Sequence, residues 1–298
     1  MTTDLSEAST GAEPEAAEPA EAPAPTRAGR ALLAVLLVAV NVPIVVATVR
    51  ALANGWQPVG DNGILLVRAR DVGTSHHPLL GSWTSASLSV GENVNNPGPV
   101  YSDVLAPWVR LLGPWVGLAV GVMLVNMASS TLAVVVARRV AGLESMLAVG
   151  VVVVGLQFAM GSELLFDVWQ PNALLLPFLA FLVVAAALAC GDRAMLPWAV
   201  GVGSLLVQTH LSYAVLVAVL GAAALALGIR ARRGRPADGS WRTPVLWAVG
   251  LAAVLWTQPL IEQFTGTGEG NLGRIVGASG GGDADPIGWG RGGRLMIE

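Results

Sequence analysis

The chain has 298 residues, of which 54% are hydrophobic and only 12% are charged. Soluble domains carry about 25% charged residues, and the apolar residues here form long uninterrupted runs, so an all-α integral membrane protein is predicted. The single cysteine, Cys190, excludes an intrachain disulfide framework, and the sequence lacks the basic stripe with interleaved aromatic residues that favours nucleic-acid binding.

The amino-terminal segment differs in charge from the remainder. Residues 1–26 hold six acidic residues and no basic one, whereas the rest holds 14 acidic residues and 17 arginines. The segment is mostly Ala, Pro and Glu, which predicts a disordered cytoplasmic tail, and it lacks the positive start and early apolar run of a signal peptide. An inert solubilising leader is the simplest interpretation, and binding of a partner is the alternative.

Apolar runs predict about seven membrane-spanning helices. Their expected ranges are 31–49, 113–136, 146–161, 173–190, 195–209, 213–229 and 244–260. The fifth and sixth ranges form one continuous run, residues 195–229, with the polar sequence 208–213 at its middle. One span needs about 20 residues, so this run is either one long span or a pair of short ones.

The positions of the arginines decide between these two interpretations. The arginine clusters beside the apolar runs are Arg27 with Arg30, Arg138 with Arg139, Arg193, Arg230 with Arg232, Arg233 and Arg235, and Arg242. With a cytoplasmic amino terminus, two spans place all of them on the cytoplasmic side, as the positive-inside rule requires. A multi-pass plasma-membrane protein is therefore expected, with His76, His77 and His210 on the extracytoplasmic face.

A large outer loop, residues 50–112, separates the first two predicted spans. Loops of this length usually have a function. It contains Gly60-Asp61-Asn62-Gly63, a His76-His77-Pro78 stretch and the sequence 93–101, NVNNPGPVY. Apolar residues from Val100 to Leu112 then recur at helical spacing, which predicts an amphipathic helix lying in the membrane interface. The sequence 95–99 is most simply a turn.

The order of these features resembles the GT-C superfamily of membrane glycosyltransferases. The resemblance rests on a first span, a large outer loop opening with Gly-Asp, interfacial helices and many further spans, together with the sequences 93–101, 169–172 and 208–213. It covers residues 30–275 and implies sugar transfer from a polyprenyl-phosphate donor, with the first-loop acid, Asp61, as catalytic base or metal ligand. The resemblance is to actinobacterial members, and to the amino-terminal portion of a longer enzyme.

The resemblance also divides the chain. A multi-span membrane domain is expected over residues 27–275, followed by a Gly-rich outer segment, 276–298, which is expected to be truncated. Many members have two adjacent acids where this chain has Asp61-Asn62. The expected partners are the lipid bilayer, the polyprenyl-phosphate sugar and a glycan, lipid or protein acceptor. A second polypeptide that supplies the missing spans is a further candidate partner.

Asp61 is the predicted catalytic residue, because a carboxylate can take the proton of an acceptor hydroxyl. The alternative is an N-cap for a helix starting at Asn62. Asp61, Glu163 and Asp167 are the metal candidates, and a divalent metal is the only cofactor that the sequence suggests. If residues 163–170 were helical, Glu163, Asp167 and Gln170 would share one face.

The remaining candidates are substrate contacts in the outer segments. Several have a plain structural alternative: interfacial snorkelling for Arg68 and Arg70, backbone hydrogen bonds for His76 and His77, a water-exposed span end for His210, a solvated loop for Glu163, Asp167 and Gln170, and interfacial anchoring for Trp169. The predicted substrate-binding residues are Arg68, Arg70, His76, His77, Tyr101, Glu163, Asp167, Trp169, Gln170, His210, Tyr213, Glu262 and Gln263.

Two other classes of function fit a multi-span chain. A transporter or flippase of envelope precursors usually shows internal repeats and polar breaks within its spans, and neither is evident here. A non-catalytic membrane subunit, acting as a scaffold for a larger complex, is the third hypothesis.

Overall fold

The structure is a computed structural model that describes residues 27–233, 240–279 and 288–296. Within these ranges every named element is a helix, and an isolated bridge between Trp83 and Asn95 is the one extended pairing. Five helices are long and apolar enough to cross a membrane. These observations confirm the expectation of an all-α membrane protein. The predicted tail, 1–26, and part of the predicted Gly-rich segment, 276–298, lie outside the described residues.

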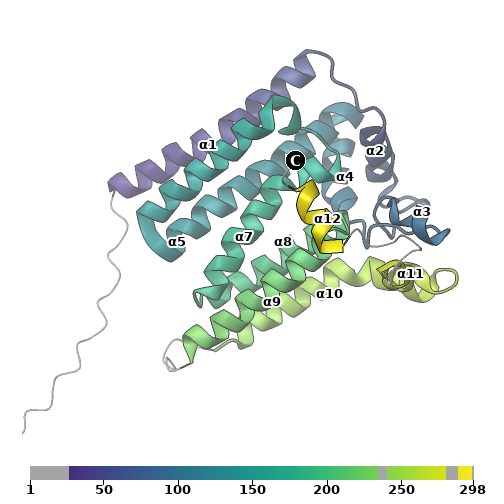
Figure 1. The fold of residues 1–298 in the computed structure, drawn as a ribbon. Coiled ribbons are helices and arrows are strands. Elements are labelled where there is room, and N and C mark those ends of the chain that lie inside the picture. The colour runs from purple at the N-terminus through teal and green to yellow at the C-terminus, as the bar shows by residue number, and fades with distance from the viewer. Residues whose placement is uncertain (1–26, 234–239, 280–287, 297–298) are drawn as a thin grey trace, which may run out of the picture.

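The five apolar helices form the body of the protein (Figure 1). They are α1 (Arg27–Ala53), α5 (Pro114–Leu164), the stretch of α6 and α7 (Gln170–Ala173 and Leu175–Ala189), α9 (Tyr213–Arg232) and α10 (Arg242–Thr265). Helix α5 bends back on itself at Ala141 and Gly142, where Gly142 has a φ of 76° that glycine adopts without a Cβ penalty. Two apolar helical segments therefore lie within α5.

The long apolar run 195–229 is divided into two helices. A short 3-10 helix, η1 (Arg193–Met195), leads into α8 (Leu196–Thr209), and residues 210–212 turn the chain into α9. This is the break that the two-helix interpretation of the run requires. Helix α8 has 14 residues, which corresponds to about 21 Å at the rise of an α-helix and is shorter than a hydrocarbon core of about 30 Å.

Buried apolar side chains hold the helices together. Leu174, Phe181 and Leu206 belong to one cluster that joins α7 to its neighbours α8 and α9. Polar side chains within the helices bond to neighbouring elements, as membrane helix packing requires. Gln157 donates to the Val40 carbonyl at 2.8 Å, and thereby joins the second half of α5 to α1.

Those predicted cytoplasmic arginines that lie within the described ranges gather at one end of the molecule. Arg139 in α5 forms an ion pair with Asp192, with 2.6 Å between Nε and Oδ2. Arg232 at the end of α9 donates to the carbonyl of Gly191 in the same turn. The bend of α5, the α7–η1 turn and the end of α9 are therefore neighbours, and the start of α1 lies at this end as well (Figure 1).

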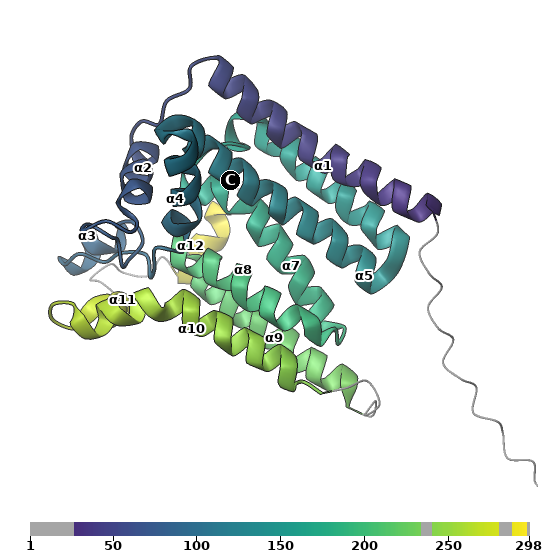
Figure 2. The same ribbon diagram turned by 180° about the vertical axis from the view of Figure 1, so that it is seen from behind.

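The opposite end carries the outer loop. It contains α2 (Asp61–Asp71), α3 (Ala86–Val90) and α4 (Val100–Leu112), with α11 (Gly270–Ser279) beside α3 (Figure 2). Helix α4 covers the predicted amphipathic range. One of its faces, with Tyr101, Leu105 and Val109, is buried against α2 and α5, while Leu111 is exposed. A last helix, α12 (Gly288–Leu295), follows the second gap in the described chain.

Candidate functional site

A cavity of about 570 Å³ lies at the loop end of the molecule. Its size is within the range of about 300–1,000 Å³ typical of small-molecule sites. Three separate parts of the chain line it: the first outer loop, the start of α6 and the turn between α8 and α9. Four of the predicted site residues meet here, namely Asp61, Trp169, Gln170 and His210.

Asp61 occupies the first position of α2. The N-cap is Gly60, whose φ of 57° suits glycine, and no side chain caps the helix. The alternative interpretation of Asp61 as an N-cap is therefore wrong, because the helix begins one residue earlier than that interpretation required. The Asp61 side chain is exposed, lines the cavity and has no hydrogen-bond or ion-pair partner in the described part of the chain. Its carboxylate is free to accept a proton from a bound hydroxyl group.

Asp167 holds two walls of the cavity together. Its Oδ1 accepts hydrogen bonds from Asn62 Nδ2 at 2.9 Å and from the Trp169 backbone N–H at 3.1 Å. Its Oδ2 accepts from Asn172 Nδ2 at 2.7 Å. The start of α2, next to Asp61, is thereby tied to the segment that carries Trp169 and Gln170. Asp167 is a positioning residue in this geometry, since both of its oxygens are engaged by protein donors.

The common helical face proposed for Glu163, Asp167 and Gln170 is not formed. Helix α5 ends at Leu164, after Gly161 has already left the helical conformation with a φ of 70°. Asp167 lies in the non-helical connection to α6. Glu163 is exposed and does not line the cavity. The spacing argument failed because the helix ends at Leu164, between the two acids, and the connection that carries Asp167 is not helical.

Trp169 and Gln170 form the second wall. Trp169 precedes α6, and 42% of its surface is exposed. Gln170 is the first residue of α6 and is buried. An exposed indole beside a buried amide presents a large apolar face next to hydrogen-bonding groups, which suits a ligand with both kinds of surface.

His210 supplies the third wall from the turn between α8 and α9. Its Nδ1 lies 2.7 Å from the hydroxyl oxygen of Ser212. Burial lowers the pKa of His210 below its ordinary value, so the ring is neutral at pH 7. Tyr213, the next predicted residue, does not line the cavity and instead packs edge-on against Phe178, with ring centroids 5.1 Å apart.

The first outer loop contributes cavity residues that the sequence did not single out. Ser82, Trp83 and Asn96 line the cavity, and the Ser82 hydroxyl oxygen is buried without a hydrogen-bond partner in the described ranges. Two antiparallel segments carry these residues: Gly81 N–H donates to the Asn96 carbonyl at 2.9 Å, and Asn96 N–H donates to the Ser82 carbonyl at 2.8 Å.

Asn96 also fixes the turn between α8 and α9, which carries His210. Its Oδ1 accepts a hydrogen bond from the Leu211 backbone N–H at 2.8 Å. The sequence 95–99 is therefore more than the turn it was predicted to be, because it joins the outer loop to the α8–α9 turn. Gly98 is required there: a Cβ at this position would lie 2.0 Å from Gln208 Oε1 and 2.8 Å from Pro259 Cγ.

The predicted arginines lie outside the cavity. Arg68 donates to the backbone carbonyls of Leu80 and Gly81, and burial lowers its pKa. Arg70 is exposed. No arginine lines the cavity as the described residues define it. Arg68 thus supports the segment that carries Ser82 and Trp83, which is a positioning role.

The adjacent histidines also lie outside the cavity. His76 is exposed, and its backbone N–H donates to Thr74 Oγ1 at 3.1 Å. His77 Nδ1 accepts from the Gly73 N–H at 2.8 Å, so its Nε2 carries the hydrogen and donates to Gln258 Oε1 at 2.9 Å.

Gln258 in turn donates to Asp103 Oδ2 at 2.8 Å. Burial raises the pKa of Asp103, and the Oδ1 atom of this carboxyl is buried without a partner in the described residues. The sequence interpretation missed Asp103, which lies among apolar residues of α4. The resulting chain of hydrogen bonds fastens the outer loop and α4 to α10.

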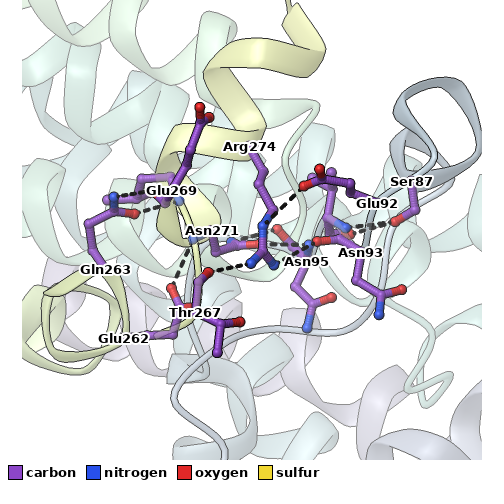
Figure 3. Close-up of polar contacts among 12 residues, drawn as sticks. Ser87, Glu92, Asn93, Asn95, Glu262, Gln263, Thr267, Glu269, Asn271 and Arg274 are labelled. Carbon is purple, nitrogen blue, oxygen red and sulfur yellow. Dashed lines mark hydrogen bonds and ion pairs between the residues drawn. The ribbon is translucent and has the colours of Figure 1, made fainter. Parts of the chain in front are cut away.

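Tyr101 and the two predicted substrate contacts in α10, Glu262 and Gln263, also stabilise the structure around the cavity. The buried Tyr101 hydroxyl donates to the Val168 carbonyl at 3.1 Å, and burial raises its pKa. Glu262 Oε2 accepts from the Asn271 N–H at 3.0 Å, and Gln263 Oε1 accepts from the Leu272 N–H at 2.8 Å (Figure 3). Glu262 and Gln263 thus bind the first turn of α11 and do not line the cavity.

The three metal candidates do not form a cation site. Among the described residues, no group of three or more His, Cys, Asp or Glu side chains could hold a metal ion. Asp61 and Asp167 are linked only through Asn62, and Glu163 lies on the exposed end of α5. The donor set of the cavity is therefore one carboxylate, one neutral imidazole, amides and hydroxyls. Comparison with known proteins adds no relative: no protein family, curated protein or solved structure matches this chain.

Proposed function

We propose that this protein is a membrane glycosyltransferase that moves a sugar from a polyprenyl-phosphate donor to an envelope glycan, lipid or protein. The observation that carries the proposal is the meeting of Asp61, Trp169, Gln170 and His210 in one cavity. They come from three segments that lie far apart in the sequence. A carboxylate without a partner among the described residues, an exposed indole and several amides form a set suited to binding and activating a sugar hydroxyl.

The reaction follows from the position of Asp61. The acceptor hydroxyl oxygen bonds to the anomeric carbon of the donor sugar, while the bond from that carbon to the phosphate oxygen breaks. The electron pair leaves with the polyprenyl phosphate, and the hydroxyl proton moves to the Asp61 carboxylate, which acts as general base. Direct displacement inverts the anomeric configuration. Neutral His210 provides a hydrogen-bonding group from another wall of the same cavity.

An apolar groove supports a lipid-linked donor. This groove, of about 570 Å³, lies between α4, α8 and α10. Its lining is almost wholly apolar and includes Val104, Trp198, Leu205, Trp247 and Leu255. Helix α4 leads from the groove to residues 96–99, and Asn96 lines the cavity. A prenyl chain lying in the groove would keep its phosphate near the loop end of the molecule.

The distribution of charge supports an extracytoplasmic active face. The arginine-bearing bend of α5 and the end of α9 lie together, away from the loop end that carries the cavity (Figure 2). The positive-inside rule assigns the arginine end to the cytoplasm. Helices α1, α7, α8, α9 and α10, with the two halves of α5, then make seven membrane segments.

Cys190 offers a test of this orientation, because it is exposed at the arginine end and is the single cysteine of the chain. A membrane-impermeant maleimide should label Cys190 in inverted vesicles and leave it unlabelled in intact cells. In a Cys190→Ser background, His76→Cys in the outer loop should show the opposite pattern. Labelling of Cys190 in intact cells would overturn the proposed orientation.

The proposed activity is tested in isolated membranes that contain the full chain. Radiolabelled polyprenyl-phosphate arabinose, mannose and glucose are supplied separately, and label entering glycan, lipid or protein is measured. Transfer above that of membranes lacking the chain is expected with one of these donors. If no donor supports transfer although the chain is correctly inserted, the glycosyltransferase proposal fails.

A further inference from the structure

A second recess adjoins the cavity at Trp83. It is an open groove of about 630 Å³ between the outer loop and the α10–α11 connection. The Trp83 side chain lines both the cavity and this groove, and 51% of its surface is exposed. On the far side from the cavity, the groove is lined by Leu88, Glu92, Asn93, Thr267 and Arg274.

The two walls of the groove are fixed to each other. Asn271 in α11 is buried and pairs with the backbone of Asn95 in both directions: Asn95 N–H donates to Asn271 Oδ1 at 2.8 Å, and Asn271 Nδ2 donates to the Asn95 carbonyl at 3.0 Å. Trp83 itself pairs with Asn95 in the isolated bridge. The indole is therefore presented on a prearranged surface, which lowers the entropy cost of binding a ligand.

The charges of the groove are largely compensated within the protein. Arg274 lies 3.5 Å from Glu92, measured from Nε to Oε2, and its other nitrogens donate to the carbonyls of Thr267 at 2.6 Å and Asn93 at 3.3 Å (Figure 3). A guanidinium engaged in this way is a poor site for a phosphate or another free anion. The groove instead offers a half-exposed indole, an exposed leucine and hydrogen-bonding groups to a neutral, hydroxyl-rich ligand.

We infer that the groove is a second carbohydrate subsite, in which a neutral oligosaccharide acceptor continues from the cavity across Trp83 toward Arg274. This inference rests on the proposed function, because the cavity is taken to hold the acceptor's reacting sugar. Sugar rings present C–H faces that pack on an indole, and their hydroxyl groups bond to carboxylates, amides and backbone carbonyls. An acceptor of several sugars would contact the cavity and, beyond Trp83, the groove as well, whereas a single sugar would contact the cavity alone.

The test is direct binding of glycans to the purified full chain in detergent, without donor, by calorimetry. The probes are neutral gluco-, manno- and arabino-oligosaccharides of increasing length, each compared with its monosaccharide. One series should bind more tightly as its length increases. Trp83→Ala should weaken the longer members by about tenfold, a loss typical of removing one aromatic contact, and Trp83→Phe should restore part of the binding.

A pair of leucine variants separates the groove from the cavity. Leu88 lines the groove and is 79% exposed, whereas Leu111 on α4 is 74% exposed and lines neither recess. Leu88→Ala should weaken the binding of longer probes and leave that of monosaccharides unchanged, while Leu111→Ala should change neither. Binding that is independent of probe length, or identical in the two leucine variants, overturns the subsite.

The same experiments distinguish failure of the subsite from failure of the proposed function. Asp61-dependent transfer to a single-sugar acceptor, without length-dependent binding, would leave the glycosyltransferase and remove the subsite. Length-dependent binding that is sensitive to Trp83 and Leu88, without transfer from any donor, would support the subsite and remove the proposed reaction.

Discussion

Replacement of Asp167 should separate the two walls of the cavity without touching its lining. Asp167→Ala removes the acceptor for three donors, Asn62 Nδ2, the Trp169 N–H and Asn172 Nδ2. Hydrogen bonds to a charged group contribute about 1.5–3 kcal/mol each, but the three are not additive, and the site is only partly buried. A loss of about 1–3 kcal/mol in the free energy of unfolding is expected, the upper part of the range for most destabilising single substitutions.

Asp167→Asn is the sharper variant, because it conserves shape and loses charge. The new side chain has an NH₂ group in place of one carboxylate oxygen. This NH₂ group would face the amide nitrogen of either Asn62 or Asn172, so that two hydrogen-bond donors would oppose each other. The free energy of unfolding of both variants is measured on the purified protein in detergent, by thermal or denaturant titration. Transfer activity should fall as well, because Asp61 and Trp169 lose their common support.

Glu163→Gln is the matched control for this prediction. Glu163 lies four residues before Asp167, is exposed, and has no side-chain hydrogen bond among the described residues. Its replacement should change stability by less than about 0.5 kcal/mol, the usual range for such surface positions. If Asp167→Asn were as stable as Glu163→Gln, the reasoning that Asp167 joins the two walls would be refuted.

Three further predictions follow from the surroundings of the cavity. Gly98→Ala should lower the free energy of unfolding by about 1–3 kcal/mol, because the added Cβ would collide with Gln208. The control is Gly155→Ala, whose Cβ would meet no atom within 4 Å and should leave stability unchanged. Thermal unfolding compares the two variants. Asp103→Asn should leave stability at pH 7 equal to or higher than that of the wild type. Burial raises the pKa of Asp103, so the stability that its protonated form provides is lost as the pH rises through this raised pKa. In a pH series of unfolding midpoints, the advantage of the Asn variant should therefore shrink on acidification. The lowered pKa of His210 means that the unfolded chain takes up its proton first below pH 6.5, so wild-type stability should fall there more steeply than that of His210→Gln, and parallel curves would contradict this.

The sequence was sufficient to predict the helical body. Apolar runs must be helical to satisfy their backbone groups in lipid, so the ranges of α1, α7 and α10 could be recognised from composition alone. The break between α8 and α9 could be predicted because, with two spans in this run, all arginine clusters lie on the same side of the membrane. The bend of α5 was equally accessible, since Arg138 and Arg139 interrupt its apolar run.

The candidate site was predicted only in part. Asp61 was predicted from its place at the head of the first outer loop and from the resemblance to GT-C glycosyltransferases. Trp169, Gln170 and His210 were predicted because they lie in polar turns between apolar runs. Their meeting in one cavity depends on contacts between distant segments, such as Asn96 with Leu211 and Asn62 with Asp167, and no local pattern encodes these. Trp83 was missed for the same reason, because its role depends on pairing with Asn95.

The role of Asp61 as general base is tested most directly by the rate of sugar transfer in Asp61→Asn. The variant keeps the size of the side chain, and Asp61 makes no side-chain bond in the described structure whose loss could unfold the protein. Asp71→Asn, at the other end of α2, is the control and does not line the cavity. We predict that Asp61→Asn inserts and unfolds like the wild type and loses transfer by at least about a hundredfold, the usual contribution of a general base, while Asp71→Asn keeps its activity. Transfer by Asp61→Asn at the wild-type rate would contradict the account.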